Sequence, residues 1–188
     1  MISDAERGQM QEVLAPDDVG SPDAESRWRA LTDRLEIEAL IHRYGYLEDF
    51  RMWDELLDLY TDDVERVLGG TLEQHVAGKE ALRALYESLT LPGDRARSYS
   101  QIASLEVKHF ISGIVVQARG DEASAVARYT ISAEGPVDGA PTRGTHDGSY
   151  VFRFLRTPSG WRFRHMLVIS GNAQNPMFQR SGGDPDDQ

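Results

Sequence analysis

The chain contains no cysteine, which excludes disulfide bonds, thiolate catalysis and cysteine-ligated metal sites. No segment approaches the roughly 18 to 20 consecutive apolar residues that a membrane-spanning helix needs. The first residues also lack the basic start and the apolar centre of a secretory signal peptide. We therefore expect a cytoplasmic protein that has no membrane partner.

Positive charge is also scarce, because 20 lysines and arginines face 31 aspartates and glutamates, for a net charge of −11. A nucleic-acid partner demands a basic face, so this balance argues against one. The 188 residues are 40% hydrophobic, which suits one domain with a substantial core. We expect a flexible N-terminal arm over residues 1–20, the folded domain over residues 21–175 and an acidic C-terminal tail over residues 176–188.

The hydrophobic period changes from helical in the first half to strand-like in the second half. The helical pattern covers residues 21–49, 52–60 and 79–89, with a short hairpin predicted over 64–68 and 71–76. The strand pattern covers residues 106–117, 123–133, 145–156 and 161–170. Helices followed by a mostly antiparallel sheet predict an α+β domain.

The strand at residues 106–117 carries apolar side chains at positions of both parities. One set is Val107, Ile111 and Val115, and the other is Phe110, Ile114 and Val116. One face must pack on the helices, so the other face needs a different cover. We therefore predict a homodimer through the outer face of the sheet.

Two polar residues stand among apolar ones in this pattern. Asp49 lies between two apolar helical stripes, where a carboxylate must reach water, find a partner or carry a perturbed pKa. Residue type alone favours a solvated aspartate at a helix end. His109 has the parity of Val107 and Ile111, and a single histidine on an apolar face is more often a core residue than a catalyst. Asp49, on a helix packed over the same sheet, is the available partner.

The stretches at residues 37–64, 107–116 and 148–163 together resemble the SnoaL-like family. This family belongs to the nuclear-transport-factor-2-like superfamily, with scytalone dehydratase, ketosteroid isomerase and bile-acid dehydratase. The resemblance covers about residues 31–172. It implies a curved, mostly antiparallel sheet that the N-terminal helices close into a cone, a cystatin-like α+β barrel whose hollow is the ligand pocket.

The resemblance also implies catalytic roles. Asp49 matches the family's acid before the pair Trp53-Asp54, His109 its strand histidine, and Tyr44 an active-site tyrosine of the dehydratase branch. Because Tyr44 and Asp49 are five residues apart, we expect the helix end to unwind or bend. The usual asparagine after the histidine is Gly113 here, so no side-chain amide is expected at that position.

Further residues are expected to line the pocket. Trp53, Tyr60, Tyr150 and Phe163 are interpreted as substrate-contacting walls, and His146 and His165 as secondary polar contacts in phase with apolar neighbours. No histidine and glutamate spacing typical of a metal site occurs, and no phosphate loop or dinucleotide fingerprint is present. We expect neither a metal nor a cofactor.

The most consistent hypothesis is a cofactor-independent acid–base enzyme, a dehydratase, isomerase or cyclase, acting on an apolar cyclic or polyketide-like small molecule. Two alternatives stay open. The chain could be a non-catalytic β subunit of a ring-hydroxylating dioxygenase, or a small-molecule-binding protein in which Asp49 and His109 only satisfy each other.

Overall fold

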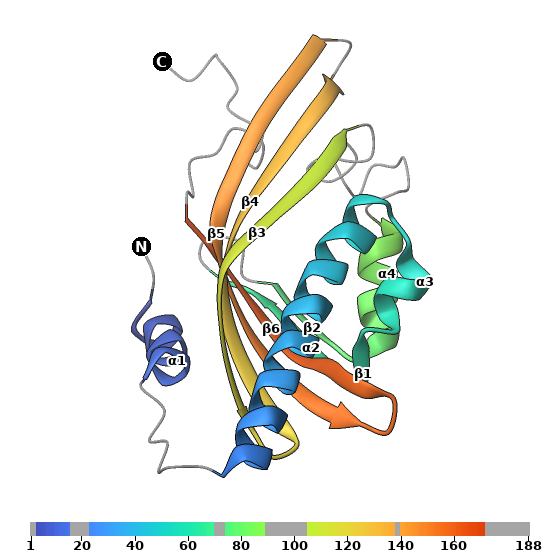
Figure 1. The fold of residues 1–188 in the computed structure, drawn as a ribbon. Coiled ribbons are helices and arrows are strands. Elements are labelled where there is room, and N and C mark those ends of the chain that lie inside the picture. Colours follow the sequence, from blue (N-terminus) through green and yellow to red (C-terminus); the bar gives the residue numbers. More distant parts are fainter. Residues whose placement is uncertain (1–2, 16–22, 70–73, 89–104, 138–139, 172–188) are drawn as a thin grey trace.

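The computed structural model describes residues 3–15, 23–69, 74–88, 105–137 and 140–171 (Figure 1). The helices in these segments are α1 (Asp4–Leu14), α2 (Ala24–Asp49), α3 (Trp53–Leu57) and α4 (Lys79–Ser88). The strands are β1 (Tyr60–Leu68), β2 (Gln74–Ala77), β3 (Glu106–Arg119), β4 (Glu122–Val137), β5 (Ala140–Thr157) and β6 (Gly160–Ser170). The expected acidic tail at residues 176–188, and residues 1–2 and 16–20 of the expected arm, lie outside the described residues.

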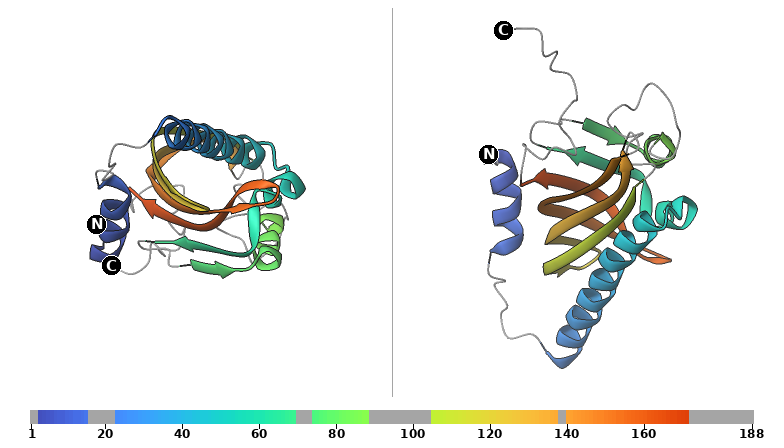
Figure 2. Two further views of the ribbon diagram at one scale, coloured as in Figure 1. Left: turned by 60° about the horizontal axis from the view of Figure 1, so that its bottom comes forward. Right: turned by 90° about the horizontal axis from the view of Figure 1, so that it is seen from above.

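The strands form one sheet in the order β2-β1-β6-β5-β4-β3. All neighbours pair antiparallel except β1 and β6, which run parallel. The sheet curves strongly, and α2 crosses its concave face while α3 and α4 lie together at one end (Figure 2). The predicted α+β class and curved sheet are confirmed. The described strands end in two edges, β2 and β3, so the sheet is not a closed barrel and the helices complete the cone.

Helix α2 is positioned by its N-cap and by one apolar face. The Asp23 carboxylate accepts a 2.7 Å hydrogen bond from the backbone N–H of Ser26, which satisfies one of the free donors at the helix start. The residues that α2 buries against the sheet recur at helical spacing: Ile37, Leu40, Ile41 and Tyr44. Each such apolar side chain stabilises the packed state by about 1.5 to 3 kcal/mol. The packing of this apolar face determines which side chains of α2 point into the cone.

The concave face holds the main core, which is rich in aromatic side chains. Its largest fully buried members are Tyr44, Tyr60, Tyr86, Tyr129, Tyr150, Phe152 and Phe163. Tyrosine carries a hydroxyl that usually finds a partner when it is buried. The interior of this cone is therefore apolar in bulk but contains many polar oxygen atoms.

A second, smaller core lies on the convex face under α1 (Figure 1). Val13 of α1 packs with the sheet residues Val126, Val151, Leu167 and Ile169. A capping box starts the helix, because the Ser3 hydroxyl accepts from the Glu6 N–H and the Glu6 carboxylate accepts from the Ser3 N–H. Residues 4–14 of the expected N-terminal arm form this helix, and Val13 packs it on the sheet.

A β-bulge in β3 changes which of its side chains share a face. The pairing with β4 shifts between Ser112 and Val115, and Gly113 has a φ of +60°. Ile111, Ile114 and Val116 consequently all pack on the main core. The predicted division of these residues into two faces is wrong, because strict alternation stops at the bulge.

The segment after α2 also differs from its prediction. The helix predicted over residues 52–60 is shorter, because α3 ends at Leu57 and Tyr60 begins β1 opposite Phe163 of β6. The hairpin predicted over 64–68 and 71–76 is present as β1 and β2, which pair antiparallel.

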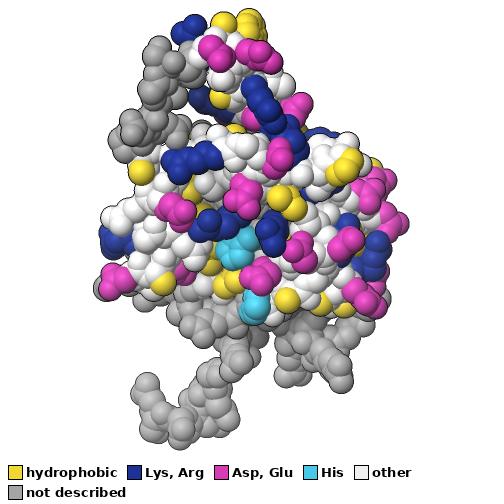
Figure 3. Space-filling model, turned by 90° about the horizontal axis from the view of Figure 1, so that it is seen from below, with side chains coloured by type: hydrophobic (Ala, Val, Ile, Leu, Met, Phe, Trp, Pro, Cys, Tyr) yellow, Lys and Arg dark blue, Asp and Glu magenta, His cyan; other side chains and the backbone are white. Residues whose placement is uncertain are grey.

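Acidic and basic side chains are interspersed on the face seen in Figure 3, without a broad field of one sign. Ion pairs link Arg153 of β5 to Glu12 of α1 at 3.0 Å, and Arg164 of β6 to Asp63 of β1 at 3.3 Å. None of the helices in the described segments combines the length and the apolar character that crossing a membrane requires.

Candidate functional site

The end of α2 is held by a sharp and regular turn. The Met52 N–H donates to the Leu47 carbonyl at 2.9 Å, and the Arg51 N–H donates to the Glu48 carbonyl at 3.1 Å. This is a Schellman motif, with Arg51 at a φ of +55° where glycine is usual. The helix therefore stays regular through Asp49, and the expectation that it unwinds or bends is wrong.

Two lines of side chains run along the last turns of α2, each with a spacing of four residues. Gly45 and Asp49 face β3, while Tyr44 and Glu48 face the concave interior. A Cβ at Gly45 would lie 3.2 Å from Ile111 Cδ1 and 3.4 Å from His109 Cβ, so the glycine allows a close approach. Because α2 approaches β3 so closely here, Asp49 can reach His109 from an undistorted helix.

Asp49 binds His109 through both the backbone and the ring. The His109 N–H donates to both Asp49 oxygens at 3.0 Å, and His109 Nδ1 lies 2.6 Å from Asp49 Oδ1. Both side chains are largely buried, at 5% exposure for His109 and 13% for Asp49. A carboxylate on Nδ1 fixes the tautomer that carries its proton there, which leaves Nε2 as the basic nitrogen.

Glu48 is the second carboxylate beside the imidazole. Its Oε2 atom lies 3.7 Å from His109 Nε2, is buried and has no hydrogen-bond partner among the described residues. Burial lowers the pKa of His109, but the charges of Glu48 and Asp49 together raise it more. The pKa of His109 thus lies above its ordinary value, and Arg66 opposes this rise.

The position of these two acids is electrostatically unfavourable in isolation. Glu48 and Asp49 stand side by side at the C-terminal end of a 26-residue helix whose last turn has no basic residue. The helix dipole disfavours negative charge at this end by about 0.3 to 1 kcal/mol per group. Local conflicts of this kind are concentrated at functional sites.

Tyr44 supplies an unengaged hydroxyl on the interior side of the histidine. Its ring meets the His109 ring edge-on, with centroids 6.2 Å apart, and its hydroxyl has no hydrogen-bond partner in the described segments. Burial, and then the charge of Glu48, hold the pKa of Tyr44 well above its usual range. The hydroxyl therefore stays protonated and can donate a hydrogen bond.

The four aromatic residues predicted as pocket walls gather around Tyr44 and Tyr86. Tyr150 and Phe163 contact Tyr44 edge-on, with ring centroids 5.8 and 5.9 Å away. Trp53 stacks on Tyr86 at 5.1 Å, and the Tyr60 and Tyr86 hydroxyls share a hydrogen bond of 3.2 Å. All four thus belong to the main core or pack against it, and Tyr44 of this core contacts the His109 ring.

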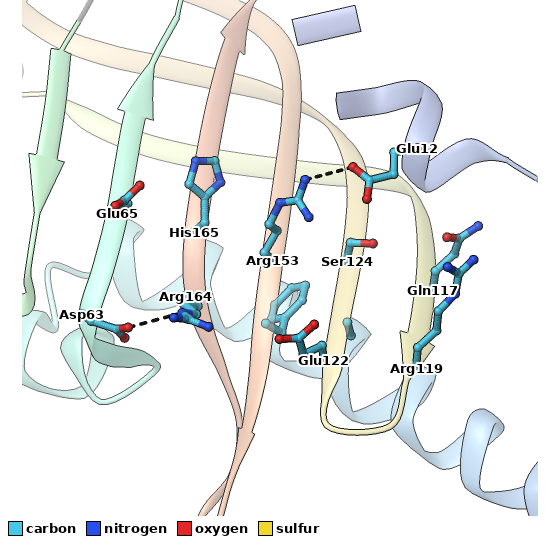
Figure 4. Close-up of a pocket in the computed structure, with 12 residues that line it drawn as sticks. Glu12, Asp63, Glu65, Gln117, Arg119, Glu122, Ser124, Arg153, Arg164 and His165 are labelled. Carbon is cyan, nitrogen blue, oxygen red and sulfur yellow. Dashed lines mark hydrogen bonds and ion pairs between the residues drawn. The ribbon is translucent and has the colours of Figure 1, made fainter. Parts of the chain in front are cut away.

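His146 and His165, the two predicted secondary polar contacts, lie on opposite faces of the sheet. His146 is buried on the interior side, with Nε2 2.7 Å from the Ser170 hydroxyl oxygen and its ring 5.4 Å from that of Tyr129. His165 instead lines a polar groove of about 460 Å³ on the convex face, beneath α1 (Figure 4). The structure therefore does not bring His165 together with the other predicted pocket residues. Arg164 is an extra residue between the pairs that β6 forms with β5, so His165 and Leu167 lie on the opposite face of the sheet from Trp161 and Phe163.

Glu48 and Arg66 were not identified from the sequence. Glu48 follows Tyr44 by four residues, and that spacing already places it on the same helical face. Arg66 alternates with Val64 and Leu68 in β1, both of which pack on the main core. Its guanidinium carbon lies 5.9 Å from the ring centroid of Tyr86, so it belongs to the concave side. Within the described segments, no group of three or more potential metal ligands occurs.

Comparison with known proteins identifies the family. The sequence profile of the SnoaL-like domain matches residues 29–167. An NTF2-like protein with a cystatin-like fold from Novosphingobium aromaticivorans is 30% identical, with a TM-score of 0.59 over 82% of this chain and 95% of that chain. No curated protein matches the sequence.

Two further structures from the same organism share the fold. One is a provisionally assigned scytalone dehydratase, 16% identical, with a TM-score of 0.60 over 84% of this chain and 95% of that one. The other is the β subunit of a provisionally assigned aromatic-ring-hydroxylating dioxygenase, 20% identical, with a TM-score of 0.59 over 76% and 91% of the two chains. The profile match and the fold confirm the resemblance seen in the sequence, and the chain belongs to the SnoaL-like family.

Proposed function

We propose that the protein is a cofactor-independent acid–base enzyme that acts as a dehydratase, isomerase or cyclase on an apolar cyclic or polyketide-like small molecule. The observation that carries this proposal is the buried contact of 2.6 Å between Asp49 Oδ1 and His109 Nδ1, at the edge of an aromatic interior. Such a pair leaves one basic nitrogen facing the interior.

In the proposed reaction, His109 Nε2 removes a proton from a carbon next to a carbonyl group. Asp49 stabilises the imidazolium that forms, as the carboxylate does in other histidine-based catalysts. Tyr44 donates a hydrogen bond to the oxygen on which negative charge develops. The proton on His109 then passes to a departing hydroxyl, which leaves as water, or to another carbon, which gives an isomer.

Deuterium exchange tests the proposal without knowledge of the natural substrate. Cyclohexanone and 1-tetralone carry acidic C–H groups beside a carbonyl, and NMR in D₂O follows the loss of these protons. We expect the wild-type protein to accelerate the exchange of at least one ketone over buffer, and His109→Ala to abolish the effect. Exchange no faster than in buffer for both ketones would favour the β-subunit or the binding-protein alternative.

The pH profile provides a second test, because His109 acts as a base only when it is neutral. The exchange rate should rise with pH through the pKa of His109, which lies above its ordinary value. Glu48→Gln removes a charge that raises this pKa, so the rising limb should move to lower pH. Arg66→Met removes a charge that lowers it, so the limb should move to higher pH.

Glu36→Gln, at an exposed position of the same helix, is the matched control and should leave the profile unchanged. If Glu48→Gln and Arg66→Met shift the pH–rate profile in the same direction, the rise in rate with pH does not report the titration of His109.

The homodimer through the outer face of the sheet stays a prediction. Helix α1 covers part of that face, and the apolar side chains of β3 that remain exposed are Phe110 and Val115. Sedimentation at micromolar concentration checks the dimer. The cytoplasmic location also stays a prediction.

A further inference from the structure

Arg66 is a charged side chain in an apolar part of the cone. On β1 it alternates with Val64 and Leu68, which pack on the main core. Its paired positions on the two neighbouring strands are Val76 and Met166, which belong to the same core. The backbone therefore directs the guanidinium toward the concave interior.

Arg66 is half-buried, and the described segments provide no ion-pair partner for it. The Arg66 Nε atom is buried without a hydrogen-bond partner there. None of the ion pairs in the same segments includes Arg66. A charge in an apolar interior is costly unless it is paired, so an arginine without an ion-pair partner among the described residues is suited to bind an anion.

The charge on Arg66 is permanent. Burial lowers the pKa of Arg66, but Tyr86, Tyr44 and Glu48 raise it more, and the net pKa lies above its already high usual range. The Tyr86 ring, 5.9 Å from the guanidinium carbon, provides a cation–π contact that leaves the N–H groups available.

The guanidinium and the histidine serve different parts of one interior. Glu48 lies 3.7 Å from His109 Nε2, and its charge also raises the pKa of Arg66, although the two side chains form no ion pair. The aromatic rings of Tyr44, Tyr60 and Tyr86 belong to the same core, and the charge of Arg66 or Glu48 affects the pKa of each hydroxyl. A ligand with an apolar body and one anionic end matches this distribution.

We infer that Arg66 binds a carboxylate of the substrate, so that the ligand of the cone is an apolar cyclic carboxylic acid. This inference rests on the proposed function, because it assigns a substrate class to the same interior. The planar guanidinium fork fits a carboxylate through two parallel hydrogen bonds, and a desolvated site strengthens both. The carboxylate takes the place of the counter-ion that the described residues do not supply, and it directs the reacting carbon toward His109.

Calorimetric titration with benzoate, cyclohexanecarboxylate and 2-naphthoate tests the inference, with the three matching amides as neutral probes. We expect the wild-type protein to bind at least one acid more than tenfold more tightly than its amide. Arg66→Met should lose that preference, and Arg66→Lys should retain part of it. Arg164→Met, on the convex face of the neighbouring strand, is the matched control and should keep the full preference.

These experiments distinguish a failure of the carboxylate-binding inference from a failure of the proposed acid–base function. Asp49→Asn, which should lose the deuterium exchange of ketones, should still prefer the acid over the amide. Wild-type protein that binds no acid more tightly than its amide overturns the inference, whether or not exchange occurs. An Arg66→Met variant that keeps the preference also overturns it.

The stability of the unliganded variant distinguishes a ligand-binding arginine from a structural one. Removal of a charge without a close partner should raise the thermal midpoint of Arg66→Met by about 2 to 4 °C. A lower midpoint than that of the wild type would mean that Arg66 supports the fold, and it would overturn the inference.

Discussion

Asp49→Asn and His109→Ala are each expected to lower the rate of ketone deuterium exchange by about 10² to 10⁴-fold, the range typical of a lost general base. Asp49→Asn keeps the size of the side chain but removes the charge that stabilises the imidazolium. His109→Ala removes the base itself. Because the two groups act as one unit, the double variant should be little slower than either single variant. NMR of the exchange in D₂O, with rates corrected for buffer, gives all three values.

His42→Ala is the matched control, since His42 is an exposed histidine on the same helix as Asp49 and should leave the rate unchanged. Circular dichroism should show that each variant remains folded. If the fold-loss in exchange rate of the double variant equals the product of the two single losses, Asp49 and His109 act independently. That result would contradict the hypothesis that they act as one unit.

Gly148→Ala is expected to destabilise the fold by about 2 to 4 kcal/mol. A Cβ at this position would meet the backbone carbonyl of Ile169 on β6, and the Tyr129 hydroxyl at 2.6 Å on β4. Neither can move freely, because Ile169 is fixed in the sheet and Tyr129 stacks on Tyr150 with ring centroids 4.3 Å apart. The thermal midpoint should fall on the order of 10 °C, as measured by scanning calorimetry.

Gly8→Ala provides the control for this change. Gly8 lies in α1, and a Cβ there would meet nothing within 4 Å. Alanine is the better helix former by about 1 kcal/mol, so this variant should be neutral or slightly more stable. A Gly148→Ala protein as stable as the wild type would show that the sheet adjusts at this position, and that the close approach of Tyr129 is not required.

The fold was predictable where one period holds over a whole element. Ile37, Leu40, Ile41 and Tyr44 are spaced as a helix requires, and all four are buried in α2. Strand faces were predictable only up to an irregularity. Gly113 and Arg164 each occupy a place where the register shifts, and hydropathy alternation alone does not reveal such an extra residue.

The candidate site was predictable only in part, for a related reason. The expected proximity of Asp49 to His109 came from the family resemblance, since no local pattern links a helix end to a strand 60 residues later. Glu48 was overlooked because its neighbour Asp49 matched the family's acid, although the spacing from Tyr44 places Glu48 toward the interior. Arg66 was overlooked because a charge within a strand usually indicates a solvated face.

The parallel pairing of β1 with β6 has a consequence for how the chain folds. Glu65 lies opposite His165, one hundred residues further along, whereas β3 to β6 pair with their sequence neighbours. Contacts between distant residues form slowly, because the loop between them must close first. During synthesis β1 and β2 are made before β6, so the edge of β1 that pairs with β6 stays unpaired until β6 is made. While it waits, the charge of Arg66 disfavours pairing with another chain, as charged residues do on natural edge strands. Arg66 would then protect the newly made β1 strand from pairing with other chains, before the folded protein binds a ligand.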